Sequence, residues 1–268
     1  MKALNVAIPT PFHEDETINF PVFIDIIKHL KQNGIESFLV SGSTGEQHSL
    51  SIDERLQIID YFQSHQAEFH DVELIFGVAA TRTKDAIRLV QALENTIFDA
   101  IMLGFPPYIR PTQEQAIHYV DTLMQYSTKE VALYNNPGRT GFDLAADSVQ
   151  TLIQKHPNIL GLKESGDIHR HQINSFPEGF IMFHAADMNF ATNFPHGFNG
   201  LSSIVANVYP QEIKQAVDEL LNSGQVDHDS INQLINEVNE KQAVIFVKNH
   251  FNQLSIHAGI CRAPITNI

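Results

Sequence analysis

The chain has 268 residues, of which 43% are hydrophobic and 18% are charged, and its formal net charge at pH 7 is −14. This length allows one large domain or two small ones. The negative charge disfavours a nucleic-acid-binding protein, because a phosphate backbone attracts lysine and arginine side chains. No segment reaches the roughly 20 apolar residues that a membrane helix requires.

The composition also favours a cytoplasmic protein without a metal centre or cofactor. Cys261 is the single cysteine, which is typical of a reducing compartment and excludes an internal disulfide. Residues 1–9 are too soon interrupted by proline for a signal peptide, and we interpret them as a first strand. Among 14 histidines, the close pair His169 and His171 is interpreted as a polar turn leading into a helix rather than as metal ligands.

Short apolar runs recur along the chain and predict eight buried strands. Most are too short for helices and carry β-branched or aromatic residues. In chain order they cover residues 4–8, 35–40, 72–78, 100–103, 131–134, 159–162, 181–183 and 201–205.

Segments with helical periodicity lie between these runs. Their signals are Asn19 before and Asn33-Gly34 after the first helix, the capping boxes Ser51-x-x-Glu54 and Thr112-x-x-Gln115, and the apolar stripe Ile87, Val90 and Leu93. Strands that alternate with helices imply parallel pairing through right-handed crossovers. Eight such units in about 210 residues predict an α/β fold, the (β/α)8 TIM barrel. A doubly wound sheet is the rival, but its glycine-rich phosphate-binding turn is missing after the first strand.

The pattern changes after the eighth strand. Residues 210–221 predict the helix that completes the last βα unit, and residues 227 to about 253 predict one longer helix. We therefore expect a catalytic barrel over residues 1–222. A short C-terminal helical extension, residues 223–268, is expected to pack on it.

Candidate catalytic side chains end two of the predicted strands, at the barrel face where active sites lie. Lys163 ends the sixth strand, where desolvation would lower its pKa and free its amine to attack a ketone. A strand-end lysine that extends to solvent is the structural alternative. Tyr134 ends the fifth strand, either to transfer protons or as a core aromatic with its hydroxyl at the rim.

Two further groups at this face suit the binding of carboxylates. Ser43 and Thr44, in a glycine-rich turn, offer hydroxyls and backbone amides, although such turns are common. Arg139 presents a guanidinium for bidentate binding, unless it pairs with Asp143 or Asp147. The convergence of a lysine, a phenol, two hydroxyls and a guanidinium on one face favours a functional site.

At these residues the sequence resembles the dihydrodipicolinate synthase/N-acetylneuraminate lyase family of pyruvate-dependent aldolases. The resemblance extends over nearly the whole chain and rests on five motifs in the family's order. They are Ala7-Ile8-Pro9-Thr10-Pro11-Phe12, Gly42-Ser43-Thr44-Gly45-Glu46, Pro106-Pro107-Tyr108, Tyr134-Asn135-x-Pro137 and Gly161-Leu162-Lys163.

The resemblance implies a class I lyase in which Lys163 forms a Schiff base with pyruvate, without metal or cofactor. It implies that Tyr134 and Thr44 transfer protons and that Ser43 and Thr44 hold the pyruvate carboxylate. Arg139 would bind the carboxylate of an aldehyde, and Tyr108 and Ser202 are also expected to contact substrate. Relatives commonly form dimers or tetramers, so we expect a homo-oligomer with no nucleic-acid or membrane partner.

Arg139 favours a condensation of pyruvate with aspartate semialdehyde, as in lysine biosynthesis, because neuraminate lyases usually lack an arginine there. The alternative is an aldolase for N-acetylneuraminate or a 2-oxo-3-deoxy sugar acid, with His48 and Asn189 as candidates to bind the polyol.

Three departures from the family weaken the choice of the synthase substrate. Ile109 stands where synthases have a second tyrosine, Ala185 stands at a glycine position, and the sequence ends at residue 268, before the family's last helix. The first and the last of them motivate a second alternative, an inactive paralogue that binds a 2-oxo acid.

Overall fold

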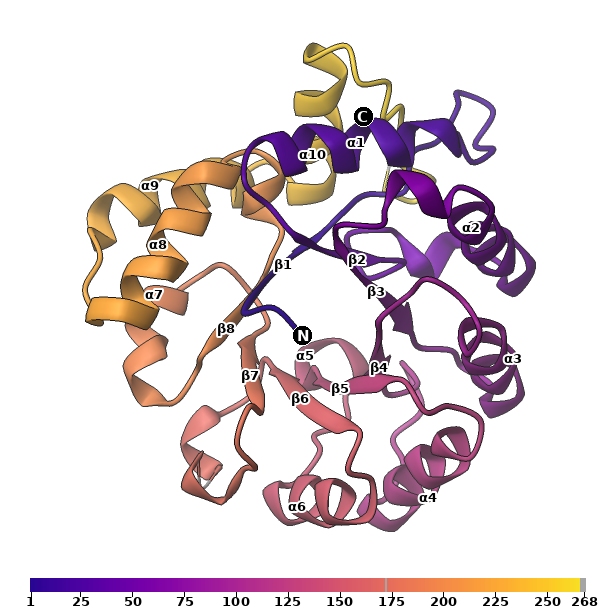
Figure 1. Cartoon of the computed structure of the whole chain (residues 1–268), viewed down its shortest axis with the longest axis vertical. Helices are drawn as coiled ribbons and strands as arrows, with labels where there is room; N and C mark the ends of the chain where they lie inside the picture. The colour runs from indigo at the N-terminus through magenta and orange to yellow at the C-terminus, as the bar shows by residue number, and fades with distance from the viewer. Residues whose placement is uncertain (172, 266–268) are drawn as a thin grey trace.

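Eight parallel strands close into a barrel in the computed structural model, which describes residues 1–171 and 173–265 (Figure 1). The strands pair in chain order, and β8 closes the barrel against β1. They are β1 (Leu4–Ala7), β2 (Ser37–Val40), β3 (Glu73–Val78), β4 (Ala100–Gly104), β5 (Glu130–Asn135), β6 (Ile159–Glu164), β7 (Ile181–His184) and β8 (Gly200–Ser203). The TIM barrel and each of the eight predicted strands are thus confirmed.

Helices surround the strands. They are α1 (Pro21–Gln32), α2 (Ile52–Ser64), α3 (Thr83–Leu93), α4 (Gln113–Met124), α5 (Pro137–Thr140), α6 (Ala146–Lys155), α7 (Phe190–Asn193), α8 (Pro210–Ser223), α9 (His228–Asn239) and α10 (Ala243–Gln253). Both predicted capping boxes form. The Ser51 hydroxyl accepts a hydrogen bond from the Glu54 amide, and Thr112 accepts one from Gln115, each at 3.2 Å.

Side chains alternate between two apolar layers, because successive residues of a strand point to opposite faces. Val6, Phe38 and Phe76 belong to the large core between the strands and the helices. Leu39 and Met102 belong to a smaller core inside the barrel, against which Tyr134 packs. Tyr134 therefore points inward from the end of β5, and Lys163 is its register partner on β6.

The prediction of one long helix after residue 227 is wrong. α9 and α10 are separate helices, and Gln242 between them has a left-handed φ of 53° that interrupts helical hydrogen bonding. α10 lies beside α1 (Figure 1), where the rings of Phe251 and His29 are in edge contact with centroids 6.1 Å apart. In the described part of the chain, no helix is both long and apolar enough to span a membrane.

Candidate active site

A cavity of about 480 Å³ opens at the carboxyl ends of the strands. The predicted site residues that line it are Ser43, Thr44, Tyr134, Arg139, Lys163 and Ser202. The barrel thus brings together side chains that lie up to 159 positions apart, counted from Ser43 to Ser202. Within the described ranges, no three His, Cys, Asp or Glu side chains are grouped as metal ligands.

Lys163 lines this cavity and is 5% exposed. Its Nζ donates a hydrogen bond to Ser202 Oγ at 2.9 Å and forms no ion pair with a carboxylate of the described residues. Burial lowers the pKa of this amine, and the nearby charge of Arg139 lowers it further, although Tyr134 and Asp187 act in the opposite direction. Burial therefore shifts the protonation equilibrium of Lys163 toward the neutral, nucleophilic form.

Tyr134 faces Lys163 across the β5–β6 pair. Lys163 Nζ lies 4.6 Å from the centre of the Tyr134 ring. The phenol oxygen accepts a hydrogen bond from Asn136 Nδ2 at 2.6 Å. Burial opposes ionisation, but the charges of Lys163 and Arg139 and hydrogen bonds from Asn136 and Ser43 lower the pKa of Tyr134 overall. This phenol is suited to exchange protons with groups bound at Lys163.

The turn that carries Ser43 and Thr44 is fixed from the C-terminal part of the chain. Glu46, which ends the motif with a φ of 52°, is fully buried. Its carboxylate lies 2.6 Å from Lys248 Nζ of α10 and accepts a hydrogen bond from the Arg262 amide at 2.9 Å. A buried ion pair with additional hydrogen bonds holds a backbone in one geometry.

Gly77 of β3 is required for the close approach of this turn. A Cβ atom at Gly77 would overlap the carbonyl oxygen of Ser41, which precedes the turn. We expect Gly77→Ala to displace the turn and to lower the free energy of unfolding by about 1–3 kcal/mol, the usual cost of overpacking. Urea unfolding measures the loss of stability. Titration with pyruvate measures the affinity for pyruvate, which should fall if the turn is displaced. An unchanged urea midpoint would show that the turn moves freely.

Arg139 lies on α5 at the rim of the cavity and is exposed. Its guanidinium makes no ion pair with a carboxylate in the described ranges, because Asp143 pairs with Arg170 Nη1 at 2.6 Å instead. The sequence left open whether Arg139 pairs with Asp143 or Asp147. In the structure the guanidinium is available to a ligand.

Three predicted ligand contacts are not brought to this cavity. Tyr108 is 89% exposed with a φ of 73°, and its neighbour Ile109 is 49% exposed. Neither of them lines the cavity. Asn189 is also exposed and outside it. His48 lines an adjoining cavity of about 750 Å³, which shares Ser43, Tyr134 and Arg139 with the first.

Several lining residues were not predicted. Asp187, in the stretch after β7, accepts hydrogen bonds from the Ser203 hydroxyl and from the Ile204 amide at 2.9 Å. Burial raises the pKa of Asp187 despite these bonds. Gln242 and Val244 reach the cavity from the α9–α10 junction. They cover it because the C-terminal helices fold back, which no local motif indicates.

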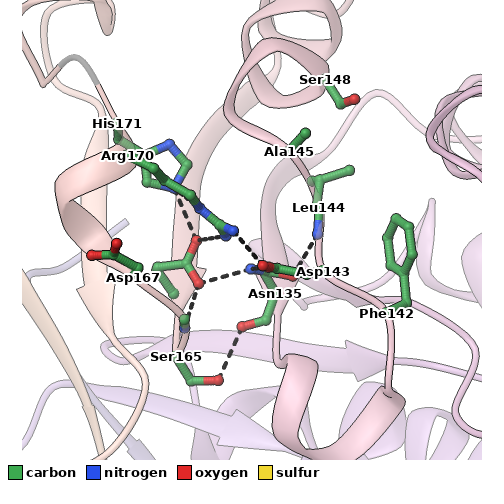
Figure 2. A network of polar contacts seen from close by, with 12 residues as sticks. Asn135, Phe142, Asp143, Leu144, Ala145, Ser148, Ser165, Asp167, Arg170 and His171 are labelled. Carbon is green, nitrogen blue, oxygen red and sulfur yellow. Dashed lines mark hydrogen bonds and ion pairs between the residues drawn. The ribbon is translucent and has the colours of Figure 1, made fainter.

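A polar network surrounds the paired ends of β5 and β6, where Asn135 lies opposite Glu164 (Figure 2). Its centre is the buried Glu164, which follows Lys163. Glu164 accepts hydrogen bonds from Asn135 Nδ2 at 2.8 Å, Arg170 Nη2 at 2.8 Å and His171 Nε2 at 2.9 Å. Since Asn135 follows Tyr134, this network ties together the strand ends that carry the two candidate catalytic residues.

The interpretation of His169 and His171 as a polar turn before a helix is corrected by this network. Residues Ile168–Arg170 and Ile173–Ser175 form only short 3-10 turns. His171 is buried because Glu164 provides an acceptor for its Nε2. Arg170 bridges Glu164 to the more exposed Asp143.

Comparison with known proteins agrees with this geometry. The sequence model of the dihydrodipicolinate synthetase family matches residues 1–268. The 4-hydroxy-tetrahydrodipicolinate synthase of Desulforamulus reducens is 32% identical over 218 residues, which are 79% of this chain and 72% of that protein.

Solved structures of the same kind share the fold. The synthase of Methylacidiphilum fumariolicum superposes with a TM-score of 0.90 at 24% identity, covering 100% of this chain and 91% of that one. The Acinetobacter baumannii synthase complexed with pyruvate has a TM-score of 0.86 at 27% identity, with 99% and 92% covered. This chain belongs to the dihydrodipicolinate synthetase family.

Proposed function

We propose that this protein is a 4-hydroxy-tetrahydrodipicolinate synthase, which condenses pyruvate with aspartate semialdehyde through a Schiff base on Lys163. The observation that carries the proposal is a buried amine opposite a phenol, in a cavity that also holds hydroxyls and an unpaired guanidinium. The names of its relatives and the pyruvate in the A. baumannii structure support the same chemistry.

The neutral amine of Lys163 attacks C2 of pyruvate while Ser43 and Thr44 hold the carboxylate. Tyr134 gives its proton to the hydroxyl of the carbinolamine, which leaves as water, and the resulting protonated imine acts as an electron sink. Tyr134, with Thr44 as relay, removes a proton from C3 and gives an enamine. The enamine carbon then attacks the aldehyde carbon of the second substrate, and the resulting alkoxide takes the proton back from Tyr134. The amino group of that substrate attacks C2, closes the ring and releases Lys163.

Borohydride reduction in the presence of pyruvate tests the first half of this proposal. Reduction converts the imine into a stable secondary amine, so peptide mass spectrometry is expected to find a pyruvate-sized adduct on Lys163. An unmodified Lys163 at saturating pyruvate would contradict the proposal and favour a site that binds a 2-oxo acid without reacting. Release of pyruvate from N-acetylneuraminate, but no condensation, would assign the sugar-acid aldolase instead.

Arg139→Ala tests the second half. We expect the KM for aspartate semialdehyde to rise roughly 10- to 100-fold, because a charge-assisted bidentate contact with its carboxylate is lost. Formation of the pyruvate adduct should change far less, since burial influences the pKa of Lys163 more than the charge of Arg139 does. An aldehyde without a carboxylate is the control, and its rate should change no more than formation of the pyruvate adduct. Equal rates with aspartate semialdehyde would refute the assigned role.

We also expect the protein to act in the cytoplasm and to form a homo-oligomer. Exposed apolar surface at Tyr108 and Ile109 supports association with a second copy. Light scattering coupled to size exclusion measures the mass, and a monomer at micromolar concentration would contradict this expectation.

A further inference from the structure

A buried polar pair lies beside Lys163 inside the barrel. β1 and β8 pair in a register that places Asn5 opposite Ser202. Asn5 is 0% and Ser202 3% exposed. The Ser202 hydroxyl donates a hydrogen bond to Asn5 Oδ1 at 2.6 Å, and Ser202 Oγ accepts one from Lys163 Nζ at 2.9 Å. A chain of two hydrogen bonds therefore runs from β1 through β8 to β6.

The direction of these two bonds matters for the chemistry of Lys163. A hydroxyl carries one hydrogen and donates it to one acceptor. With that hydrogen on Asn5 Oδ1, Ser202 offers only lone pairs to Lys163. A neutral amine has two N–H groups and one lone pair. Lys163 therefore uses an N–H toward Ser202, and its lone pair stays free.

We propose that Asn5 is a positioning residue, which draws the hydroxyl hydrogen of Ser202 away from Lys163 and keeps the lone pair of the amine free to attack a 2-oxo acid. This inference rests on the proposed role of Lys163 as nucleophile. Asn5 acts through Ser202 and does not itself line the cavity. Ser202, which the sequence suggested as a substrate contact, acts here on the lysine.

The consequence of removing Asn5 follows from the same geometry. Asn5→Leu keeps the branching of the side chain at Cγ but removes the acceptor. The acceptor that remains in contact with the Ser202 hydroxyl is Lys163 Nζ, so the hydrogen turns to the lone pair and occupies it. Attack by the amine then requires that this hydrogen bond breaks first.

The decisive comparison is between Asn5→Leu and the double variant Asn5→Leu/Ser202→Ala. We expect Asn5→Leu to slow the reaction of Lys163 roughly tenfold, the rate equivalent of one net hydrogen bond. Adding Ser202→Ala removes the hydrogen that blocks the lone pair, so the double variant should react faster than Asn5→Leu and as fast as Ser202→Ala alone. Ser202→Ala alone is the reference for this comparison, because it measures what loss of the hydrogen bond between Ser202 and Lys163 costs by itself.

The rate at which Lys163 reacts is measured with two reagents, and peptide mass spectrometry quantifies the modified lysine in both cases. Reductive methylation with formaldehyde and cyanoborohydride reports the nucleophilicity of the amine without any 2-oxo acid, and borohydride trapping with pyruvate reports the proposed reaction. If methylation proceeds but pyruvate leaves no adduct, the proposed function fails, and the methylation rates still decide the role of Asn5.

The pH dependence of methylation separates this role from a packing defect. A hydrogen bond to the lone pair stabilises the neutral amine, so the midpoint of the pH–rate profile should move to lower pH in Asn5→Leu. Asn5→Ala provides the same test should the leucine variant not fold. The inference is overturned if Asn5→Leu reacts as fast as the unmodified protein, or if the double variant is slower than Asn5→Leu.

Discussion

Replacing Lys163 with methionine is expected to lower turnover by about 10,000-fold or more and to abolish the pyruvate adduct. Methionine fills a similar volume but has no lone pair that attacks a carbonyl carbon. Steady-state rates with pyruvate and aspartate semialdehyde, together with borohydride trapping, measure both effects. A trapped adduct on another lysine of the variant would contradict the assignment of Lys163.

The same variant should be more stable than the unmodified protein at pH 7. Burial lowers the pKa of Lys163 in the folded chain, whereas an unfolded lysine titrates near about 10.4. Between these two pKa values the unfolded chain binds the additional proton, so the free energy of unfolding of the unmodified protein rises with pH. The variant lacks this contribution, and its advantage should therefore shrink as the pH approaches 10. Urea midpoints at pH 7 and 9.5 measure the difference. If the stability advantage of the variant grew with pH instead, burial would not lower the pKa of Lys163 in the folded chain.

Most of the fold could be predicted from the sequence because its signals are local. A run such as residues 72–78 is apolar, β-branched and short, and a capping box fixes the start of α2. The break between α9 and α10 was missed, because Gln242 adopts a left-handed backbone without a glycine or proline to mark it. Its conformation depends on tertiary contacts.

The candidate site could be predicted from the sequence for those residues that stand at the ends of strands. The ends of parallel strands meet at one face, so Lys163, Tyr134 and the turn at Ser43 had to converge. Tyr108 was predicted from a motif alone, and in the structure its side chain is directed to solvent. Asn5 carried a signal that was overlooked: a polar residue inside an apolar run of the first strand, where burial requires a partner.

Glu164→Gln is expected to lower the free energy of unfolding by about 3 kcal/mol or more, the usual cost of breaking a buried ion pair. The side chain of Glu164 is 0% exposed, and Arg170, His171 and Asn135 all donate to it. A glutamine amide places its own N–H groups against these donors, so Arg170 keeps its charge next to an unfavourable partner.

Asp143→Asn is the matched control, because Asp143 also pairs with Arg170 but is 50% exposed. Solvent screens that pair, so the control should cost less than about 1 kcal/mol.

Glu164→Gln should also slow formation of the pyruvate adduct, since Glu164 and Asn135 fix the strand ends next to Lys163 and Tyr134. Urea unfolding of the two variants and their trapping rates measure these effects side by side. Equal losses of stability would show that the ion pair between Arg170 and Asp143 contributes as much as the contacts of Glu164. An unchanged trapping rate in Glu164→Gln would show that the network does not affect the reaction of Lys163.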